Sequence, residues 1–322
     1  MHRRHILGLA AVGLAAPSVL RAEGVWPERP LRIIVPFPPG GSNDTIARLL
    51  QPHLTEALGQ QVVIENKGGA AGSIGAMEAS RSAADGYTWL LVNDNEATNQ
   101  TTMRLNYQIM QAFAPASLLA TGPLALVAHK DTPWKTFQDL VAAAKLSPEA
   151  IAYATSGIGS LAHVSTTLLQ QIGGFKLTHV PYKGGGPALQ DALSGQVPLF
   201  MSNVVIISQH IKSGALRPLG VTTAGETPHV PGVKSFAQQG FASFEAPTWW
   251  ALLGRAGMPE PALKRMSAAV VKIMQAPEVR GRIEGMGADV LGGGPEWCRR
   301  FLNSEVAKWA QVIRDHDITA DG

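Results

Sequence analysis

The sequence predicts an α/β fold in which strands and helices alternate along the whole chain. Short runs of apolar and β-branched residues are followed by segments whose apolar residues recur every three or four positions. Glycine and proline separate these segments. The chain has 322 residues, of which 45% are hydrophobic and 16% charged, so it is long and apolar enough for two domains with cores of their own. This alternation favours mostly parallel sheets.

The elements can be placed from the periodicity. Leu31 to Val35 is an apolar strand, and the apolar positions from Ile46 to Leu58 have helical spacing, with Gly59 as the stop. Further strands are expected at 62–65, 88–92, 124–128, 151–154, 178–180, 197–201 and 249–253. Further helices are expected at 76–79, 137–144, 161–172, 187–193, 204–211, 261–274, 277–286 and 295–314.

The N-terminus has the pattern of a signal peptide over residues 1–22. Arg3 and Arg4 precede a short apolar run, and Ala22 ends a plausible cleavage site, so the fold starts near Gly24. The paired arginines leave both the Sec and the twin-arginine export routes open. The chain is expected in the periplasm, since no later stretch is long enough to span a membrane.

Charge and cysteine content exclude several classes of protein. The formal net charge is +3, from 27 basic and 24 acidic residues. Cleavage would remove three basic residues and no acidic one, so the mature protein would be neutral and would lack the positive surface that nucleic acids require. The single cysteine, Cys298, excludes a disulfide framework and a thiolate metal cage.

Three glycine-rich loops each lie between a strand and a helix, at 38–42, 155–160 and 182–186. The first amides of a helix have no partner inside it, and the helix dipole makes that end partly positive, so such a loop can bind an anion without a basic side chain. The first two loops contain no Lys or Arg, which favours a carboxylate over a polyphosphate. The alternative is that these loops only turn the chain and that Ser42 and Ser160 are N-caps.

The sequence gives little support to nucleotide binding, metal binding or catalysis. Gly157 to Ala162 fits the G-x-G-x-x-A pattern of a dinucleotide site, but the acidic residue expected about 20 positions later is absent from 176–181. The histidines do not have metal-ligand spacing, and the common catalytic motifs are missing. We therefore expect no catalytic residue, metal or cofactor. His163 is either a structural N-terminal histidine or a ligand donor. Of Trp249 and Trp250, one is expected in the core and the other beside a ligand.

A set of motifs then identifies a resemblance. In order, the motifs are Trp26-Pro27-Glu28-Arg29-Pro30, the segment 34–44 (IVPFPPGGSND), Ile64-Glu65-Asn66-Lys67-Gly68-Gly69, Ala84-Asp85-Gly86-Tyr87-Thr88, Phe113-Ala114-Pro115, Ala154-Thr155-Ser156-Gly157 with Gly159, Val180-Pro181-Tyr182-Lys183-Gly184, Pro187-Ala188 and Thr248-Trp249. From Trp26 to the C-terminus, the chain resembles the substrate-binding proteins of tripartite tricarboxylate transporters, the Bug family of periplasmic receptors.

The resemblance implies a periplasmic-binding-protein type II fold, with two lobes and a ligand cleft between them. Lobe 1 would comprise residues 24–123 and 247–322, and lobe 2 residues 124–246. The expected ligand-binding residues are Phe37, Gly40, Gly41, Ser42, Asn93, Thr155, Ser156, Gly157, Gly159, Ser160, His163, Ser202, Asn203 and Trp249.

The implied function is capture of a small organic carboxylate by a monomeric receptor, which delivers it to the membrane subunits of a transporter. Two alternatives remain: a receptor of the same fold that serves a sensor protein, and an enzyme that uses the glycine loop. Family members commonly have Asp where this chain has Ser202, and a small Gly/Ser pair where it has Asn93-Asp94-Asn95-Glu96. Both positions would face the distal part of the ligand, so its identity among dicarboxylates, tricarboxylates, acidic amino acids and aromatic acids stays open.

Overall fold

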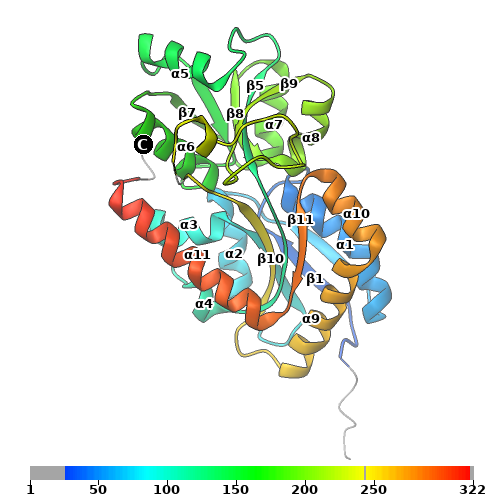
Figure 1. Ribbon diagram of the computed structural model, residues 1–322. Helices are drawn as coiled ribbons and strands as arrows, with labels where there is room; N and C mark the ends of the chain where they lie inside the picture. Colours follow the sequence, from blue (N-terminus) through cyan, green and yellow to red (C-terminus); the bar gives the residue numbers. More distant parts are fainter. Residues whose placement is uncertain (1–25, 243, 320–322) are drawn as a thin grey trace, which may run out of the picture.

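The computed structural model describes residues 26–242 and 244–319, so the expected signal peptide at 1–22 lies outside the described residues. Two lobes, each a sheet with helices packed on it, lie one above the other in Figure 1. The strands of lobe 1 are β1 (Leu31–Val35), β2 (Val62–Asn66), β3 (Thr88–Asn93), β4 (Phe113–Gly122), β10 (Thr248–Arg255) and β11 (Asp289–Gly293). Those of lobe 2 are β5 (Leu124–His129), β6 (Ala152–Thr155), β7 (Thr178–Pro181), β8 (Leu199–Asn203) and β9 (Leu216–Val221).

The helices cover both sheets. Lobe 1 has α1 (Ser42–Leu58), α2 (Ser73–Ser80), α3 (Asn95–Thr102), α4 (Ile109–Ala112), α9 (Glu260–Gln275), α10 (Pro277–Met286), α11 (Pro295–Asp315) and the short 3₁₀ turn η1 (Ala70–Gly72). Lobe 2 has α5 (Phe137–Leu146), α6 (Leu161–Gly173), α7 (Gly185–Ser194), α8 (Val204–Lys212) and the 3₁₀ turn η2 (Ala237–Gln239).

The sheet topology corrects one prediction. The strand orders are β11-β4-β10-β3-β1-β2 in lobe 1 and β7-β6-β8-β5-β9 in lobe 2. Parallel pairing is confined to β1 with β2 and β3, and to β6 with β7 and β8, whereas every pairing of β4, β5, β9, β10 and β11 is antiparallel. The expectation of mostly parallel sheets was therefore wrong, because the strands at the lobe crossings join each sheet in the opposite direction.

The sequence prediction missed three strands and two helices, for identifiable reasons. β4 and β9 each contain a proline, Pro115 and Pro218, a residue that argues against a strand interior. β11 is a short strand that contains two glycines. Helix α3 (NEATNQTT) has no apolar stripe to reveal it, although most of its residues are buried, and α4 is a single four-residue turn.

The chain passes between the lobes at two adjacent places. Gly122, at the end of β4, pairs with Thr248 at the start of β10, so the two connecting segments run side by side. Thr222 ties them together, since its hydroxyl accepts the N–H of Leu124 at 2.9 Å and donates to the carbonyl of Ala246 at 2.8 Å. We propose these segments as the hinge.

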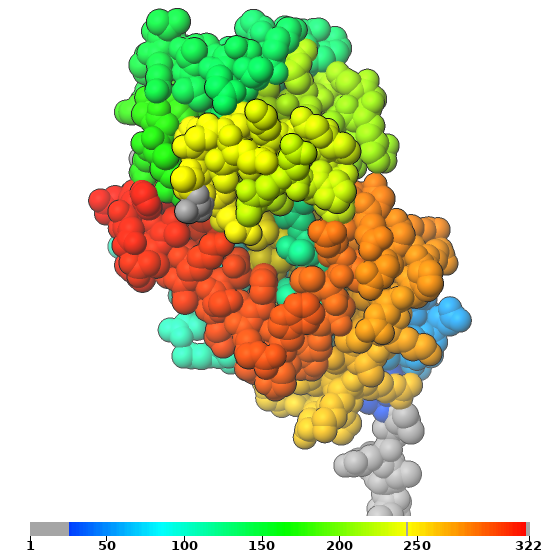
Figure 2. Space-filling model, viewed as in Figure 1, coloured from blue at the N-terminus to red at the C-terminus, as the bar shows by residue number. Residues whose placement is uncertain are grey.

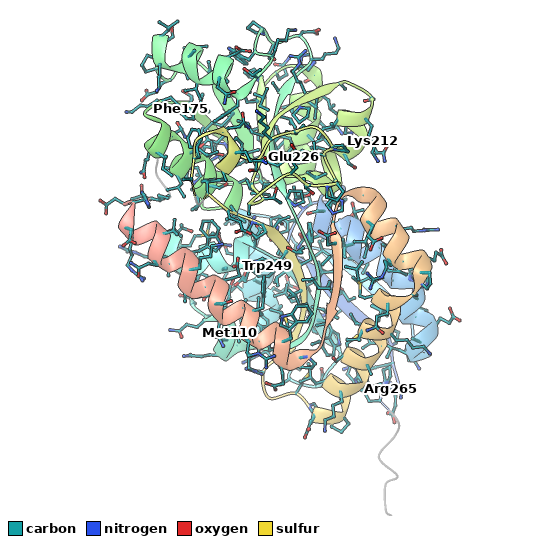
Figure 3. All side chains as sticks on the ribbon, in the orientation of Figure 1. Met110, Phe175, Lys212, Glu226, Trp249 and Arg265 are labelled. Atoms are coloured by element: carbon teal, nitrogen blue, oxygen red, sulfur yellow. The ribbon has the colours of Figure 1, made fainter. Side chains whose placement is uncertain are left out.

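The lobes also contact each other directly. On the face shown in Figure 2 their surfaces meet, with a hollow between them. Figure 3 places Trp249 in the sheet of lobe 1, where it is fully buried. The contact between the lobes brings together the loops that follow β1, β3, β6 and β8, which are the loops expected to bind a ligand.

Candidate ligand-binding cleft

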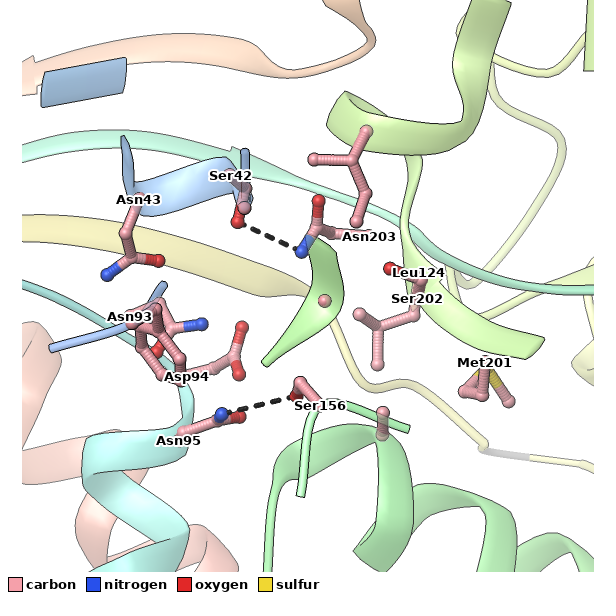
Figure 4. A pocket seen from close by; sticks show the side chains of 15 residues that line it. Ser42, Asn43, Asn93, Asp94, Asn95, Leu124, Ser156, Met201, Ser202 and Asn203 are labelled. Atoms are coloured by element: carbon pink, nitrogen blue, oxygen red, sulfur yellow. Dashed lines mark hydrogen bonds between the residues drawn. The ribbon is translucent and has the colours of Figure 1, made fainter. Parts of the chain in front are cut away.

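A cavity of about 30 Å³ lies between the lobes (Figure 4). It opens at the C-terminal ends of β1, β3, β6 and β8, the position where α/β sheets commonly bind ligands. The residues that line it are Phe37, Gly41, Ser42, Asn43, Asn93, Asp94, Asn95, Leu124, Ser156, Ala162, Gly185, Met201, Ser202, Asn203 and Ile206. Both lobes therefore contribute to one cavity.

The loop after β1 presents the N-terminus of α1 to the cavity. Its amide at Gly40 is already bonded to the carboxylate of Asp44 at 3.0 Å, and Gly40 needs glycine because its φ is +84°. Burial opposes ionisation of Asp44, but hydrogen bonds from Arg48, Gly40 and Asn66 hold its pKa below the ordinary value. Asp44 thus fixes the loop, and the amides of Gly41, Ser42 and Asn43 at the start of α1 are left for a ligand.

Ser42 is the most informative side chain in this loop. Its Oγ accepts two hydrogen bonds, one from the indole N–H of Trp250 at 3.2 Å and one from Nδ2 of Asn203 at 3.1 Å. A serine hydroxyl has two acceptor positions and one proton. With both acceptor positions filled, the proton of Ser42 is available to donate to an anion in the cavity.

The loop after β3 supplies a buried acid and two amide side chains. Asp94 accepts a short hydrogen bond from the hydroxyl of Thr248, and burial raises its pKa to about 7. Asn95 reaches across the cleft: its Oδ1 accepts the N–H of Leu161 at 3.1 Å, and its Nδ2 donates to Ser156 at 3.4 Å. Of the four residues that depart from the family pattern, Asn93, Asp94 and Asn95 line the cavity.

The fourth of these residues, Glu96, does not line the cavity. Its carboxyl group is buried and accepts a hydrogen bond from Gln100 at 3.0 Å. Burial raises its pKa to about 8. Glu96 therefore belongs to the interior of lobe 1.

The loop after β6 uses most of its amides internally. The N–H of Gly157 bonds to the hydroxyl of Thr155, that of Gly159 bonds to Nδ1 of His163, and that of Ser160 bonds to the carbonyl of Gly157. Ser160 caps α6 by accepting the N–H of His163 at 3.2 Å. These residues shape the loop, while Ser156 and Ala162 reach the cavity.

His163 is placed as a structural histidine. It is 1% exposed, and its ring stacks on that of His179 with 4.1 Å between centroids. Burial lowers the pKa of His163 to about 4 and that of His179 to about 3, so both rings are neutral at pH 7. Nδ1 of His163 accepts from Gly159, which leaves its proton on Nε2.

Half of the expected binding residues line the cavity. They are Phe37, Gly41, Ser42, Asn93, Ser156, Ser202 and Asn203. Gly40, Thr155, Gly157, Gly159, Ser160 and His163 lie in the same loops but not on the cavity wall. Trp249 lies elsewhere: it is 0% exposed, and its indole N–H donates to the carboxylate of Glu305 at 3.1 Å. Its neighbour Trp250 is the tryptophan that contacts the site, through Ser42.

The prediction missed several residues of the wall, namely Asn43, Leu124, Ala162, Gly185, Met201 and Ile206. Asn43 and Ala162 sit in the first turns of α1 and α6, next to predicted residues, so extending each loop by one turn would have found them. The apolar residues carry no sequence signal that distinguishes a cavity wall from a core.

Residues 26–242 and 244–319 show neither a metal-ligand cluster nor a membrane-spanning helix. No cluster of three or more His, Cys, Asp or Glu side chains in that part of the chain could hold a metal ion. No helix there is both long and apolar enough to cross a membrane.

Comparison with known proteins identifies relatives over nearly the whole chain. The family model for the tripartite tricarboxylate transporter family receptor matches residues 46–318. Protein BugT of Bordetella pertussis is 34% identical over 310 residues, which cover 95% of this chain and 94% of BugT.

Solved structures agree with this. The periplasmic binding protein BugD superimposes with a TM-score of 0.87 at 30% identity, covering 91% of this chain and 99% of BugD. A Rhodopseudomonas palustris protein solved with adipate has the same TM-score at 31% identity, covering 91% of this chain and 99% of that one. The predicted fold class, with two lobes and a cleft between them, is confirmed.

Proposed function

Since this chain belongs to the tripartite tricarboxylate transporter receptor family, we propose that it captures a small organic carboxylate in the cleft and delivers it to the membrane subunits of such a transporter. The observation that supports this most is the donor set of the cavity. The first turn of α1, the hydroxyl of Ser42 and the first turn of α6 all face a cavity, and the described residues that line it include no Lys, Arg or His. A family relative of similar structure was solved with adipate, a dicarboxylate.

Each group contributes through a simple interaction. One carboxylate oxygen between the helices would accept hydrogen bonds from the hydroxyl of Ser42 and from the backbone N–H groups of Ser42 and Asn43, all in lobe 1. The other oxygen would accept the amide of Ala162 from lobe 2. Hydrogen bonds to a charged group contribute about 1.5–3 kcal/mol each, and the positive ends of both helix dipoles add to the attraction.

Tight binding by this arrangement requires both lobes. Fixing a small ligand costs at least about 4 kcal/mol of lost translational and rotational freedom, so the few donors of one lobe are a weak site. Closure places donors from α1 and α6 on one ligand. The closed surface is also what a membrane partner would recognise, because the empty, open receptor has a different shape.

We further propose that the receptor works as a monomer in the periplasm, after export directed by residues 1–22, and that it catalyses no reaction. Among the described residues of the cavity wall, Asp94 is the one carboxylic acid, and its carboxyl group already accepts from Thr248. A serine nucleophile needs a general base within hydrogen-bond reach, whereas Ser42 and Ser156 are bonded to indole and amide N–H donors, which cannot take up a proton.

A thermal-shift screen of organic acids on the mature protein, followed by calorimetry, tests the proposal. A ligand at a hundred times its Kd should stabilise the protein by about 2.7 kcal/mol. We expect one or more carboxylates to bind and redox cofactors not to bind. A protein that binds NAD or a flavin, and no organic acid, would contradict the proposal and favour the enzyme.

A further inference from the structure

The cavity has an unusual lining for a carboxylate receptor. Asp94 is the one ionisable group among the described residues that line it, and amide side chains from Asn43, Asn93, Asn95 and Asn203 make up much of the remaining polar wall. The site therefore offers donors at the helix ends and an acid beside them.

Asp94 has no compensating positive charge. It is 3% exposed, and in the described part of the chain no Lys, Arg or His nitrogen lies within 4.0 Å of its carboxyl group. Its partners are the neutral hydroxyl of Thr248 and the backbone N–H of Trp249. Burial raises the pKa of Asp94, and repulsion from another acid, Glu305 on α11, raises it further. The carboxylate of Glu305 accepts the indole N–H groups of Trp249 and Trp309.

A second acceptor on the wall is also unsatisfied. Nδ2 of Asn203 is bonded to Ser42, but its Oδ1 is buried and accepts no hydrogen bond from the described residues. A buried acceptor without a partner is unfavourable. Oδ1 of Asn203 thus provides a free acceptor on the same wall as Asp94, whose carboxyl group has only neutral partners among the described residues.

Resting on the function proposed above, we propose that the ligand has one carboxylate, bound by the helix N-termini, and a protonated amine that pairs with Asp94, in place of a second carboxylate. A like charge within about 4–6 Å of Asp94 would force either Asp94 or the ligand to take up a proton. An ammonium group would instead pair with Asp94, and its remaining N–H bonds suit amide oxygens such as Oδ1 of Asn203. The ligand of this chain would then differ from adipate, the diacid with which a similar protein was solved.

Three matched sets of acids test the inference by calorimetry on the mature protein. Within a set the carboxylate and spacer are constant and only the far end changes, from ammonium to carboxylate to methyl. The sets are glycine, malonate and propionate; β-alanine, succinate and butyrate; and 5-aminopentanoate, adipate and hexanoate. We expect the ammonium acid of at least one set to bind about tenfold or more tightly than its diacid, a difference of ~1.4 kcal/mol.

Asp94→Asn provides the residue-level test. It keeps the size and a hydrogen-bonding group beside Thr248 but removes the charge, so it should lower the preference for ammonium over diacid by about tenfold. Glu96→Gln is the matched control: it makes the same exchange of an acid for an amide at the next buried acid, which lies off the cavity wall, and should leave the preference unchanged. Should Asp94→Asn fail to fold, Asn93→Asp adds a charge to the same wall without removing a bond to Ser42, and it should raise the preference instead.

The outcomes separate the two proposals. Diacids that bind as tightly as or more tightly than their ammonium partners in all three sets would overturn the inference and leave carboxylate capture intact. So would binding of other organic acids when none of the three ammonium acids binds. Binding of no organic acid at all would overturn both.

Discussion

Gly186 offers a way to disturb closure of the cleft without disturbing either lobe. It lies in the first turn of α7 in lobe 2. A methyl group at this position would lie 2.9 Å from the carbonyl oxygen of Pro39 and 3.5 Å from the amide of Gly41, both in lobe 1. Within lobe 2, it would meet nothing so close. The collision therefore exists only when the lobes are together.

Gly186→Ala should weaken ligand binding without lowering the stability of the fold. Overpacking a close contact costs about 1–3 kcal/mol, and a cost that falls only on the closed form should weaken ligand binding about 5- to 150-fold. Alanine is also the better helix former, by up to about 1 kcal/mol, so the protein should be as stable to heat as wild type or more so. Weaker binding in an equally stable protein is the signature of a blocked closure.

Gly281→Ala is the matched control. Gly281 lies in α10, and a methyl group there would have no neighbour within 4 Å. Calorimetry with the tightest organic acid of the screen measures affinity, and small-angle scattering with and without that acid measures closure. We expect Gly281→Ala to behave as wild type and Gly186→Ala to keep a larger radius of gyration. Equal affinities and equal radii for the two variants would refute closure as the source of affinity.

Three further predictions concern single side chains. Ser42→Ala should weaken carboxylate binding by about 1.5–3 kcal/mol, whereas Ser304→Ala, which removes an exposed hydroxyl bonded to a backbone carbonyl, should not; calorimetry that finds no difference would remove Ser42 from the site. Asn95→Ala removes two hydrogen bonds that cross the closed cleft, so it should weaken carboxylate binding by about 1–3 kcal/mol, and calorimetry that finds wild-type affinity would contradict a contribution of Asn95 to closure. Burial raises the pKa of Glu96 from its ordinary value of 4.5 to about 8 in the folded protein, so the protonated form favours the folded state, and that contribution is lost as pH rises from about 4.5 to 8. Glu96→Gln should therefore lose less stability than wild type between pH 5 and 8 in urea unfolding, and parallel pH profiles would contradict this.

Much of the fold could be predicted because local patterns matched the tertiary structure. The strand at 31–35 and the helix end at Leu58 were placed correctly, since an apolar run and a glycine with φ of +71° at position 59 are local signals. Strand direction was not predictable in this way. β4 and β10 run antiparallel to their neighbours because of where the chain crosses between lobes, and no short segment encodes that.

The binding loops were found, but the groups free to bind were not. A strand, a glycine loop and a helix are visible in sequence, whereas the occupation of an amide by a side chain is not. Asp44 takes the amide of Gly40 and His163 takes that of Gly159, so two predicted donors are already used. Which of Trp249 and Trp250 lies beside the cavity could not be predicted, for another reason. β10 is buried on both faces, so alternation along the strand gives no hint of which face holds the ligand.

The cross-lobe bonds explain why a ligand should be needed to hold the cleft closed. Asn95 of lobe 1 accepts the N–H of Leu161 at the N-terminus of α6. Asn203 of lobe 2 donates to Ser42 at the N-terminus of α1 (Figure 4). These are neutral bonds, each contributing a net ~0.5–1.5 kcal/mol because water replaces them when the lobes part. The bonds from Asn203 and Trp250 fill the acceptor positions of the Ser42 hydroxyl, so this hydroxyl can donate to a ligand. A carboxylate at that point adds charge-assisted bonds to both helices at once. The neutral bonds thus set the closed geometry, and the charge of the ligand supplies the larger part of the free energy that maintains it.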